Sequence, residues 1–369
     1  MDIIRSAAMP YDPERIAIQI MTRGHPEKFK TAITSLEGTV TDFTRICLWV
    51  YVDLDDETAR DLIEHYRINP PAIPINWILG PRTTSMGATC NFIYSQARES
   101  SGLFFGFPDD FRITSEHWDE EIRTVFRAHP DRLVLAYLKD QEHNDIAKMM
   151  ALSREWVDTL GYFFPAYFPY WFGDLWIDQI SQAMGRKVQL KMTVADVGGS
   201  RGRTQRMWNL PFWSRFFTAC APQRWQDVER LYTAMATTTP DVLEALRAQR
   251  THWLQKFRVE LNNVGVLSPR QLVEVEWAQT REDSAIPLVY LKAEAEAVQH
   301  LVKTGQHFGR TFKIPPTIPA GGVTAGLQAE VVQALMAGAS FIEIGAHTPE
   351  QASRALEWRN TYVQGLAAR

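Results

Sequence analysis

The stretch Gly102-Leu-Phe-Phe-Gly-Phe-Pro-Asp-Asp-Phe111 is the part of this chain that decides its fold and its chemistry. Its apolar run predicts a strand over 103–107, and the run ends in two adjacent carboxylates, Asp109 and Asp110. Carboxylate oxygens hold hard divalent cations, and a cation with few protein ligands takes further oxygens from phosphate groups. The stretch therefore predicts a buried strand that presents a site for a cation and a phosphate compound where it leaves the sheet.

Apolar runs alternate with amphipathic segments upstream of this strand, which indicates an α/β fold with a mostly parallel sheet. The predicted strands and helices are, in order, 15–21, 26–36, 46–52, 58–66, 75–79 and 89–100. Ligands of such sheets bind at the carboxyl ends of the strands. The polar residues that follow the four strands are Thr22, Arg23 and Gly24, then Asp53 and Asp55, then residues 80–87, and finally Asp109 and Asp110.

Composition sets the class of the protein. The 369 residues are 45% hydrophobic and 22% charged, and the formal net charge of −4 argues against a dedicated nucleic-acid binder. Three widely separated cysteines, Cys47, Cys90 and Cys220, lack the spacing of a zinc site and suit a reducing compartment. No signal-like N-terminus and no stretch of 18 apolar residues is present, so we expect a cytoplasmic protein without a transmembrane segment.

Four segments carry a resemblance to a known family. They are Ile16-Ala-Ile-Gln-Ile-Met-Thr-Arg-Gly-His-Pro-Glu-Lys28, Trp49-Val-Tyr-Val-Asp53, Gly87 with Asn91, and Phe107-Pro-Asp-Asp110. In this order and spacing, residues 15 to about 190 resemble glycosyltransferases of the GT-A fold, above all the bacterial inverting enzymes that use nucleotide-sugar donors. The resemblance implies a Rossmann-type, mostly parallel sheet flanked by helices. Two positions depart from the family pattern: Phe111 replaces a third acid, and Cys90 replaces an arginine.

The resemblance implies roles for the polar residues at the sheet edge. Asp53 would contact the base or ribose of the donor, and Thr22 and Arg23 would line the base pocket. Asp109 and Asp110 would hold Mg²⁺ or Mn²⁺ against the diphosphate, whose charge must be stabilised as it leaves. Arg82 and Asn91 complete the residues expected to bind the donor. Each acid also has a plain structural alternative, as a turn former or helix cap.

Transfer of a sugar needs an acceptor and a base. In inverting enzymes a carboxylate removes the proton of the acceptor hydroxyl. The resemblance places that carboxylate at Asp174, with Asp178 as the alternative, and Asp174 would equally suit a helix N-cap before 175–184. Nine aromatics lie within the 15 residues 162–176, and Tyr170 or Trp171 would contact a saccharide acceptor, although aromatics also fill ordinary cores.

A glycine and arginine segment follows the sheet, Asp196-Val-Gly-Gly-Ser-Arg-Gly-Arg-Thr-Gln-Arg206. Such a segment suits a loop that closes over a bound diphosphate, with Arg201, Arg203 or Arg206 on the phosphates. An ordinary flexible connector has the same composition. Both interpretations stay open.

The rest of the chain predicts further units. We expect a nucleotide-sugar and acceptor domain over 1–206, a helical segment over 207–265 and a small α/β unit over 266–369. The helical segment would pack on the catalytic domain or on a second subunit, so a homo-oligomer is compatible with it. The predicted elements are helices at 225–236, 241–261, 293–304 and 327–337, with strands at 286–291 and 340–345. The Gly321-Gly322 turn also resembles the closing units of a phosphate-binding β/α barrel; assembly or acceptor presentation is the alternative.

The sequence thus predicts a glycosyltransferase that moves a sugar from a nucleoside-diphosphate donor to a saccharide or surface polymer, with inversion and with metal assistance. Two alternatives come from other classes. A sugar-phosphate nucleotidyltransferase shares much of this fold, but Met21-Thr-Arg-Gly-His-Pro26 lacks the glycine density that its first loop needs. A non-catalytic protein that binds glycans or assembles a larger structure would not turn over a donor.

Overall fold

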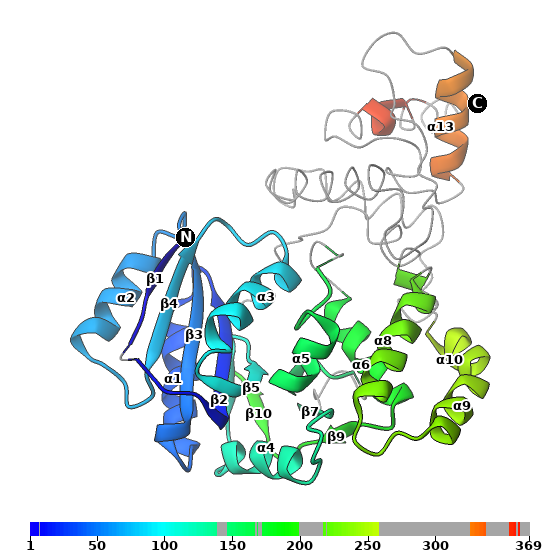
Figure 1. Ribbon diagram of the computed structural model, residues 1–369. Helices are drawn as coiled ribbons and strands as arrows, with labels where there is room; N and C mark the ends of the chain where they lie inside the picture. Colours follow the sequence, from blue (N-terminus) through cyan, green and yellow to red (C-terminus); the bar gives the residue numbers. More distant parts are fainter. Residues whose placement is uncertain are drawn as a thin grey trace. The chain divides into compact units, whose positions relative to one another are not determined.

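The computed structural model describes residues 1–6, 8–138, 146–166, 168, 172–198, 217–218, 220–257, 325–336, 354–358 and 361 (Figure 1). The chain divides into two compact units, one of residues 1–166, 171–201 and 224–253, the other of residues 167–170, 202–223 and 254–369. The domain borders expected after residues 206 and 265 lie outside the described ranges. Within those ranges no helix has the length and apolar character needed to cross a bilayer.

The first unit is built on a sheet of eight strands in the order β1-β4-β3-β2-β5-β8-β7-β9. The bounds are β1 Asp2–Ile4, β2 Asp12–Thr22, β3 Ile46–Asp53, β4 Ile75–Gly80, β5 Ser101–Gly106, β7 Leu135–Leu138, β8 Met149–Ser153 and β9 Lys187–Gln189. Strands β4, β3, β2 and β5 are mutually parallel. Strand β1 pairs antiparallel with β4, and β8 pairs antiparallel with both β5 and β7. The predicted α/β class with a mostly parallel core is confirmed.

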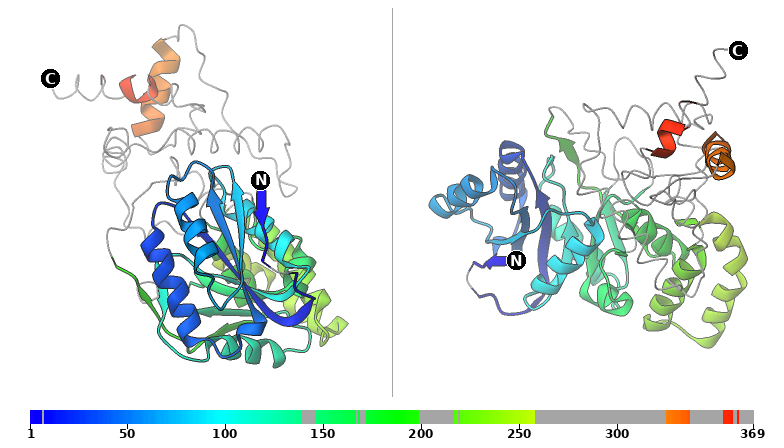
Figure 2. Two further views of the ribbon diagram at one scale, coloured as in Figure 1. Left: turned by 90° about the vertical axis from the view of Figure 1, so that its left-hand side faces the viewer. Right: turned by 90° about the horizontal axis from the view of Figure 1, so that it is seen from above.

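Helices cover both faces of this sheet (Figures 1 and 2). The bounds are α1 Pro26–Thr39, η1 Phe43–Arg45, α2 Ala59–Ile68, α3 Met86–Ala97, α4 Trp118–Arg127, α5 Arg154–Leu160, α6 Gly173–Ala183, α8 Ala221–Ala234, α9 Pro240–Ala248 and α10 Arg250–Lys256. Helices α1, α2 and α4 bury residues in one core cluster with the sheet. Helix α3 contacts β2 and β3, and α5 contacts β5 and β8.

The alternation of side chains explains the two layers. Along β2, Ile16, Ile18 and Ile20 belong to the core cluster that α1 shares, so Ala17 and Gln19 face the opposite side, because successive strand residues point to opposite faces. Helix α1 presents Phe29, Ala32, Ile33 and Leu36 to the cluster, the spacing of a single helix face. Both faces of β3 are buried, which is typical of a central parallel strand.

Strand order fixes where a ligand can bind. From β2 the chain proceeds outward through β3 to β4, and then returns to place β5 on the other side of β2. Neighbouring loops therefore leave in opposite directions from the carboxyl ends of β2 and β5, which forms a crevice at that edge. Thr22 ends β2, and Asp109 and Asp110 follow β5.

Several boundaries differ from the predicted ones. Helix α3 begins at Met86, ahead of the predicted residue 89, because the Ser85 hydroxyl accepts the N–H of Ala88 as an N-cap. The predicted helix over 241–261 is two helices, since the Gln249 N–H turns back to the Leu246 carbonyl and ends α9. The antiparallel strands β7 and β8 were not predicted.

A two-stranded ribbon lies beside the acidic pair. It consists of β6 (Phe111–Ile113) and β10 (Val194–Asp196), paired antiparallel. The second unit contains α13 (Ala325–Met336), on which Val331, Val332 and Leu335 are buried. This helix corresponds to the one predicted over 327–337. The elements predicted at 286–291, 293–304 and 340–345 lie outside the described residues.

Candidate functional site

The acidic pair lies at the crevice between β2 and β5. Strand β5 ends at Gly106, and the N–H of Phe107 still donates to the Gln19 carbonyl of β2 at 3.0 Å. The Thr22 side chain at the end of β2 lies close enough to the carboxylate of Asp109 to oppose the rise in its pKa. These two contacts hold the start of the acidic loop against the end of β2. The structure thus brings together Thr22 and Asp109, as the sequence predicted.

Among the described residues, no lysine or arginine forms an ion pair with Asp109 or Asp110. Burial raises the pKa of Asp109 above its ordinary value, and the adjacent charge of Asp110 raises it further. The Thr22 hydrogen bond and the neighbouring His25 oppose this shift without cancelling it. A cation at this place would relieve the repulsion between the two acids.

The donor set decides what kind of cation could bind. No group of three or more histidine, cysteine or acidic residues is placed to hold a metal within the part of the chain that the structure describes. Two carboxylates are nevertheless the set with which Mg²⁺ is commonly held, because it keeps waters and takes substrate phosphates as its other ligands. The residues fit a Mg²⁺ or Mn²⁺ ion whose coordination shell a diphosphate completes.

The ribbon brings a third segment to the same place. The Val197 N–H donates to the Asp110 carbonyl at 2.8 Å, immediately after Asp196 of β10 has paired with Phe111 of β6. The glycine and arginine segment therefore leaves β10 beside the acidic pair. Gly198, at φ +83, makes the first turn of that segment. The predicted phosphate contacts, Arg201, Arg203 and Arg206, lie outside the described residues.

Asp53 ends β3 and is almost fully buried. One carboxylate oxygen accepts from the Thr83 N–H at 2.8 Å and from the Thr83 hydroxyl at 3.1 Å. The other oxygen accepts from the Arg23 guanidinium at 3.1 Å. Asp53 thus joins the loop after β2 to the loop after β4. The predicted neighbours Arg23 and Asp53 are in direct contact, whereas Thr83 was not recognised from the sequence.

Asp55 extends this network outward. It pairs with Arg23 at 2.5 Å and with Arg82 at 3.9 Å. Although burial alone would raise it, the hydrogen bond and charge of Arg23 hold the pKa of Asp55 below its ordinary value. Both predicted cations, Arg23 and Arg82, therefore gather on one acid at the mouth of the site. The position of Asp55, two residues after Asp53, is the sequence signal that could have indicated that Asp55 pairs with both arginines.

The side chain of Asn91 forms three hydrogen bonds within the fold. Its side-chain carbonyl accepts from the N–H groups of Phe163 at 2.7 Å and Phe164 at 3.1 Å, and its amide nitrogen donates to the Phe164 carbonyl at 2.8 Å. Only one amide N–H is left for any ligand. Asn91 thus binds the aromatic segment to α3, and its predicted contact with the donor stays a prediction.

The same segment positions Asp174. A Cβ on Gly173 would lie 3.3 Å from the Phe164 ring, so the start of α6 packs closely on the residues that Asn91 holds. Asp174 lies in the first turn of α6 and accepts from the Leu175 N–H at 2.8 Å, while Phe172 occupies the N-cap. Burial raises the pKa of Asp174 against the opposing effects of that N–H and of Lys148. A carboxylate in this state is a stronger base than a solvated one.

Asp178, the predicted alternative base, is buried and has several hydrogen-bond donors. Its side chain is 2% exposed, and it pairs with the Lys187 ammonium at 2.7 Å. It also accepts from the Ala147 N–H at 2.9 Å and the Gln182 amide at 2.6 Å. A buried carboxylate with these three donors is not accessible to an acceptor hydroxyl. Asp178 anchors α6 to β9 and to the segment before β8, and these contacts favour Asp174 over Asp178 as the predicted base.

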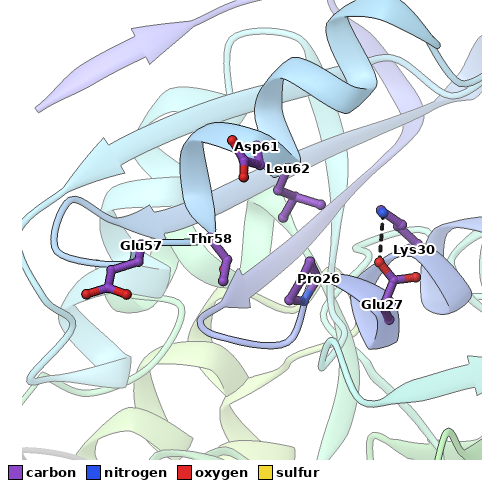
Figure 3. A pocket seen from close by; sticks show the side chains of 7 residues that line it. All are labelled: Pro26, Glu27, Lys30, Glu57, Thr58, Asp61 and Leu62. Carbon is purple, nitrogen blue, oxygen red and sulfur yellow. Dashed lines mark hydrogen bonds and ion pairs between the residues drawn. The ribbon is translucent and has the colours of Figure 1, made fainter.

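A cavity of about 260 Å³ opens between the first turns of α1 and α2 (Figure 3). Its lining residues are Pro26, Glu27, Lys30, Glu57, Thr58, Asp61 and Leu62. The lining carries three carboxylates and one ammonium, and Lys30 is already paired with Glu27 at 2.8 Å. Such a lining repels phosphates. Although the cavity is close in the fold to the ends of β2 and β3, it is not suited to a nucleotide donor.

No protein-family model matches the sequence, and a search of curated proteins finds no similar one. Among solved structures, S. aureus TarS 1–349 in complex with UDP-GlcNAc is 10% identical, with a TM-score of 0.49 over 95% of this chain and 92% of that chain. The mannosyltransferase PcManGT from Pyrobaculum calidifontis, in complex with GDP-Man and Mn²⁺, is 11% identical, with a TM-score of 0.41 over 79% and 90%. GalNAc-T7 with UDP, GalNAc and Mn²⁺ is 10% identical, with a TM-score of 0.46 over 64% and 55%. Similarities this distant leave the function of the chain to be inferred from its own residues.

Proposed function

We propose that this chain is a glycosyltransferase that moves a sugar from a nucleoside-diphosphate donor to a saccharide acceptor. The observation that carries the proposal is the acidic pair Asp109 and Asp110, which lies without a balancing cation at the crevice between β2 and β5. Carboxylates that repel each other at a ligand-binding edge are suited to a divalent cation and the phosphates that it attracts.

Different residues around the acidic pair would bind different parts of the donor. Asp109 and Asp110 would hold Mn²⁺ or Mg²⁺, which when bound supplies positive charge against the departing diphosphate. Thr22, Arg23 and Asp53 would face the nucleoside, because they lie at the ends of the two strands next to the crevice. Arg82, together with Arg201 and Arg203, would add positive charge on the phosphates. The close contact of Asp53 with Arg23 and Thr83 keeps its carboxylate in a fixed orientation for this role.

Asp174 would act as the base. The acceptor oxygen attacks the anomeric carbon of the donor, the new carbon–oxygen bond forms, and the bond between that carbon and the phosphate oxygen breaks. The electron pair of the broken bond leaves with the nucleoside diphosphate, and the proton of the acceptor hydroxyl passes to the Asp174 carboxylate. Attack from the face opposite the diphosphate inverts the configuration. The raised pKa of Asp174 favours this proton transfer.

The acceptor class follows from the surroundings of Asp174. Phe163 and Phe164 lie in the segment that packs on the start of α6, and aromatic faces suit the apolar faces of sugar rings. The predicted acceptor contacts Tyr170 and Trp171 lie in the same segment, outside the described residues. A saccharide or a related surface polymer therefore remains the expected acceptor.

The test is turnover of a donor panel. The full chain is incubated with Mn²⁺ and with uridine, guanosine and thymidine diphosphate sugars, with and without oligosaccharides, and release of the nucleoside diphosphate is measured. We expect release that EDTA abolishes and that the Asp109→Asn/Asp110→Asn variant lacks. Formation of a sugar nucleotide from a sugar phosphate and a nucleoside triphosphate would instead indicate a nucleotidyltransferase. Glycan binding without any turnover would indicate a non-catalytic protein.

A further inference from the structure

Gln19 lies in the middle of the central strand with its side-chain amide unsatisfied. The residue is 3% exposed, and neither its amide oxygen nor its amide nitrogen has a hydrogen-bond partner in the described structure. Burial of such a group without partners is unfavourable, and most buried polar groups in proteins are paired. A buried amide that the protein leaves unsatisfied is a candidate for hydrogen bonding with a ligand.

A space adjoins this amide. Gln19 pairs in register with Gly106 of β5, across the strand pair that forms the crevice. Gly106 has no side chain and is partly exposed, although it lies inside the sheet. A Cβ built on Gly106 would meet nothing nearer than 3.9 Å, where it would touch the Met150 carbonyl and the Phe163 ring. A methyl group would therefore fit on Gly106 in ordinary van der Waals contact, and the glycine leaves that position, next to the side chain of Gln19, unfilled.

The same row of the sheet contains a satisfied amide for comparison. Trp49 pairs with Gln19 on one side and with Asn76 on the other, so the three side chains share a face. The Asn76 amide donates to the Leu48 carbonyl at 3.2 Å and accepts from the Ser6 N–H and hydroxyl, each at 3.1 Å. A structural amide on this face therefore has its partners within the fold, whereas Gln19 does not.

We propose that Gln19 binds the sugar of the nucleotide-sugar donor; this inference rests on the proposed function and extends it. Gln19 lies three residues before Thr22 and on the other face of β2, away from the residues assigned to the nucleoside. That face leads over Gly106 to Phe163, in the segment that holds the start of α6 and Asp174.

The chemistry of the amide favours a sugar over a phosphate. A phosphate only accepts hydrogen bonds and suits cations, whereas a neutral amide both donates and accepts. Sugar hydroxyls also do both, so a vicinal pair of hydroxyls matches the oxygen and nitrogen of Gln19. Binding of the sugar would satisfy an amide that the free protein leaves without partners, so the contact would discriminate between donors rather than between nucleotides.

The test separates the sugar from the nucleotide. Affinities of the wild type and of Gln19→Met are measured by calorimetry with Mn²⁺ for uridine and guanosine diphosphates, each alone and as the glucose, N-acetylglucosamine or mannose derivative. For the derivative that the wild type prefers, we expect Gln19→Met to lose about tenfold in affinity, the effect of one or two neutral hydrogen bonds. Affinity for the free diphosphate should not change. The melting temperature should equal or exceed that of the wild type, because an unsatisfied amide is removed.

Two further variants make the result specific. Gly106→Ala fills the space beside Gln19 without a steric conflict, so it should also weaken binding of the sugar nucleotide and leave the free diphosphate unaffected. Asn76→Leu removes the satisfied amide and should lower the melting temperature while the preference for the sugar nucleotide stays. If Gln19→Met instead melts lower and binds both ligands as the wild type does, Gln19 is a structural residue and the inference is wrong. If the wild type binds neither diphosphates nor their sugar derivatives, the proposed function fails as well.

Discussion

The carboxyl ends of β3 and β5 both present two acids, yet the protein treats the two pairs in opposite ways. Asp53 and Asp55, after β3, are paired with Arg23. Asp109 and Asp110, after β5, are adjacent acids, and Thr22, His25 and a backbone N–H only partly oppose the effects of burial and repulsion that raise the pKa of Asp109. The first pair has a cation partner within the fold, whereas the second has no ion pair with lysine or arginine in the described ranges. The sequence motif and the position at a strand end do not distinguish the two acidic pairs. The side chains that contact each pair do distinguish them.

The same contrast recurs along α6. Asp178 is buried against Lys187, and its carboxylate is occupied by further donors. Asp174, one turn earlier, accepts from the Leu175 N–H, and burial raises its pKa. Asp178 has a direct ion pair that fixes it in the fold, whereas the proposed base Asp174 has no ion pair at contact distance among the described residues and keeps a raised pKa. The predictions below test this contrast, beginning with the acids after β5.

The largest effect is expected from neutralising the pair after β5. In Asp109→Asn/Asp110→Asn the charges that would hold the cation are gone while the shapes are kept, so donor turnover should fall by at least about a thousandfold. Asp2→Asn, at an exposed aspartate of edge strand β1, is the control and should retain full turnover. Nucleoside diphosphate release at saturating Mn²⁺ measures both. A double variant that keeps even a tenth of the activity would contradict the proposed cation site.

The next effect concerns the two aspartates of α6. Asp174→Asn should lower kcat by about a hundredfold or more with little change in KM for the donor, because a general base is lost. The limb of the pH–rate profile that reports the base should disappear. Asp178→Asn carries the same substitution on the same helix and should keep that limb. Its free energy of unfolding should instead fall by about 3 kcal/mol, because Lys187 is left without its buried partner.

A weaker effect is expected from removing Arg23, the arginine that pairs with Asp53 and Asp55. Arg23→Met removes the arginine that Asp53 and Asp55 share and leaves Asp55 with the more distant Arg82, so the end of β3 becomes more like that of β5. Nucleoside diphosphate affinity should fall by about tenfold, since one charge-assisted contact is lost and two acids repel the phosphates. Arg67→Met breaks an exposed ion pair with Glu64 and serves as the control. Equal affinities of the two variants would remove Arg23 from the site.

How far the sequence could predict the site depends on how far apart the contacting residues lie along the chain. Strand and helix alternation placed Asp53, Asp109 and Asp110 at one edge, because that inference needs only local periodicity and the general property of parallel sheets. The role of Asn91 depends on backbone groups of Phe163 and Phe164, more than 70 residues away. No local pattern encodes such a contact.

Asp178 shows the same limit at shorter range. Its spacing from Asp174 puts both on one helix, but the partner Lys187 comes from β9, a strand of only three residues. The antiparallel half of the sheet was missed for a similar reason: β7 and β8 are short, and the pairing of β8 with β5 is decided by packing rather than by alternation. The sequence could not show which charged side chains form ion pairs in the folded protein.

The smallest predicted effect is on stability, and its sign separates the two acidic ends. The folded-state pKa of Asp109 is raised, so ionisation of its carboxyl group destabilises the native state. The free energy of unfolding therefore falls as the pH rises from the ordinary pKa of aspartate through the raised pKa of Asp109. Asp109→Asn should therefore gain about 1 kcal/mol in the free energy of unfolding at pH 7, and the gain should vanish below about pH 4, the ordinary range of aspartate.

Asp55 should behave in the opposite way. Its folded-state pKa is lowered by Arg23, so its contribution is present at neutral pH and is lost as pH falls through that lowered value. Asp55→Asn should lose stability at pH 7, by less than about 1 kcal/mol because the side chain is half exposed, and the loss should vanish in acid. Urea denaturation of both variants between about pH 3 and pH 7 measures the two slopes. Slopes of the same sign would mean that the acids after β3 and β5 are balanced alike, and the distinction on which the proposed cation site depends would be lost.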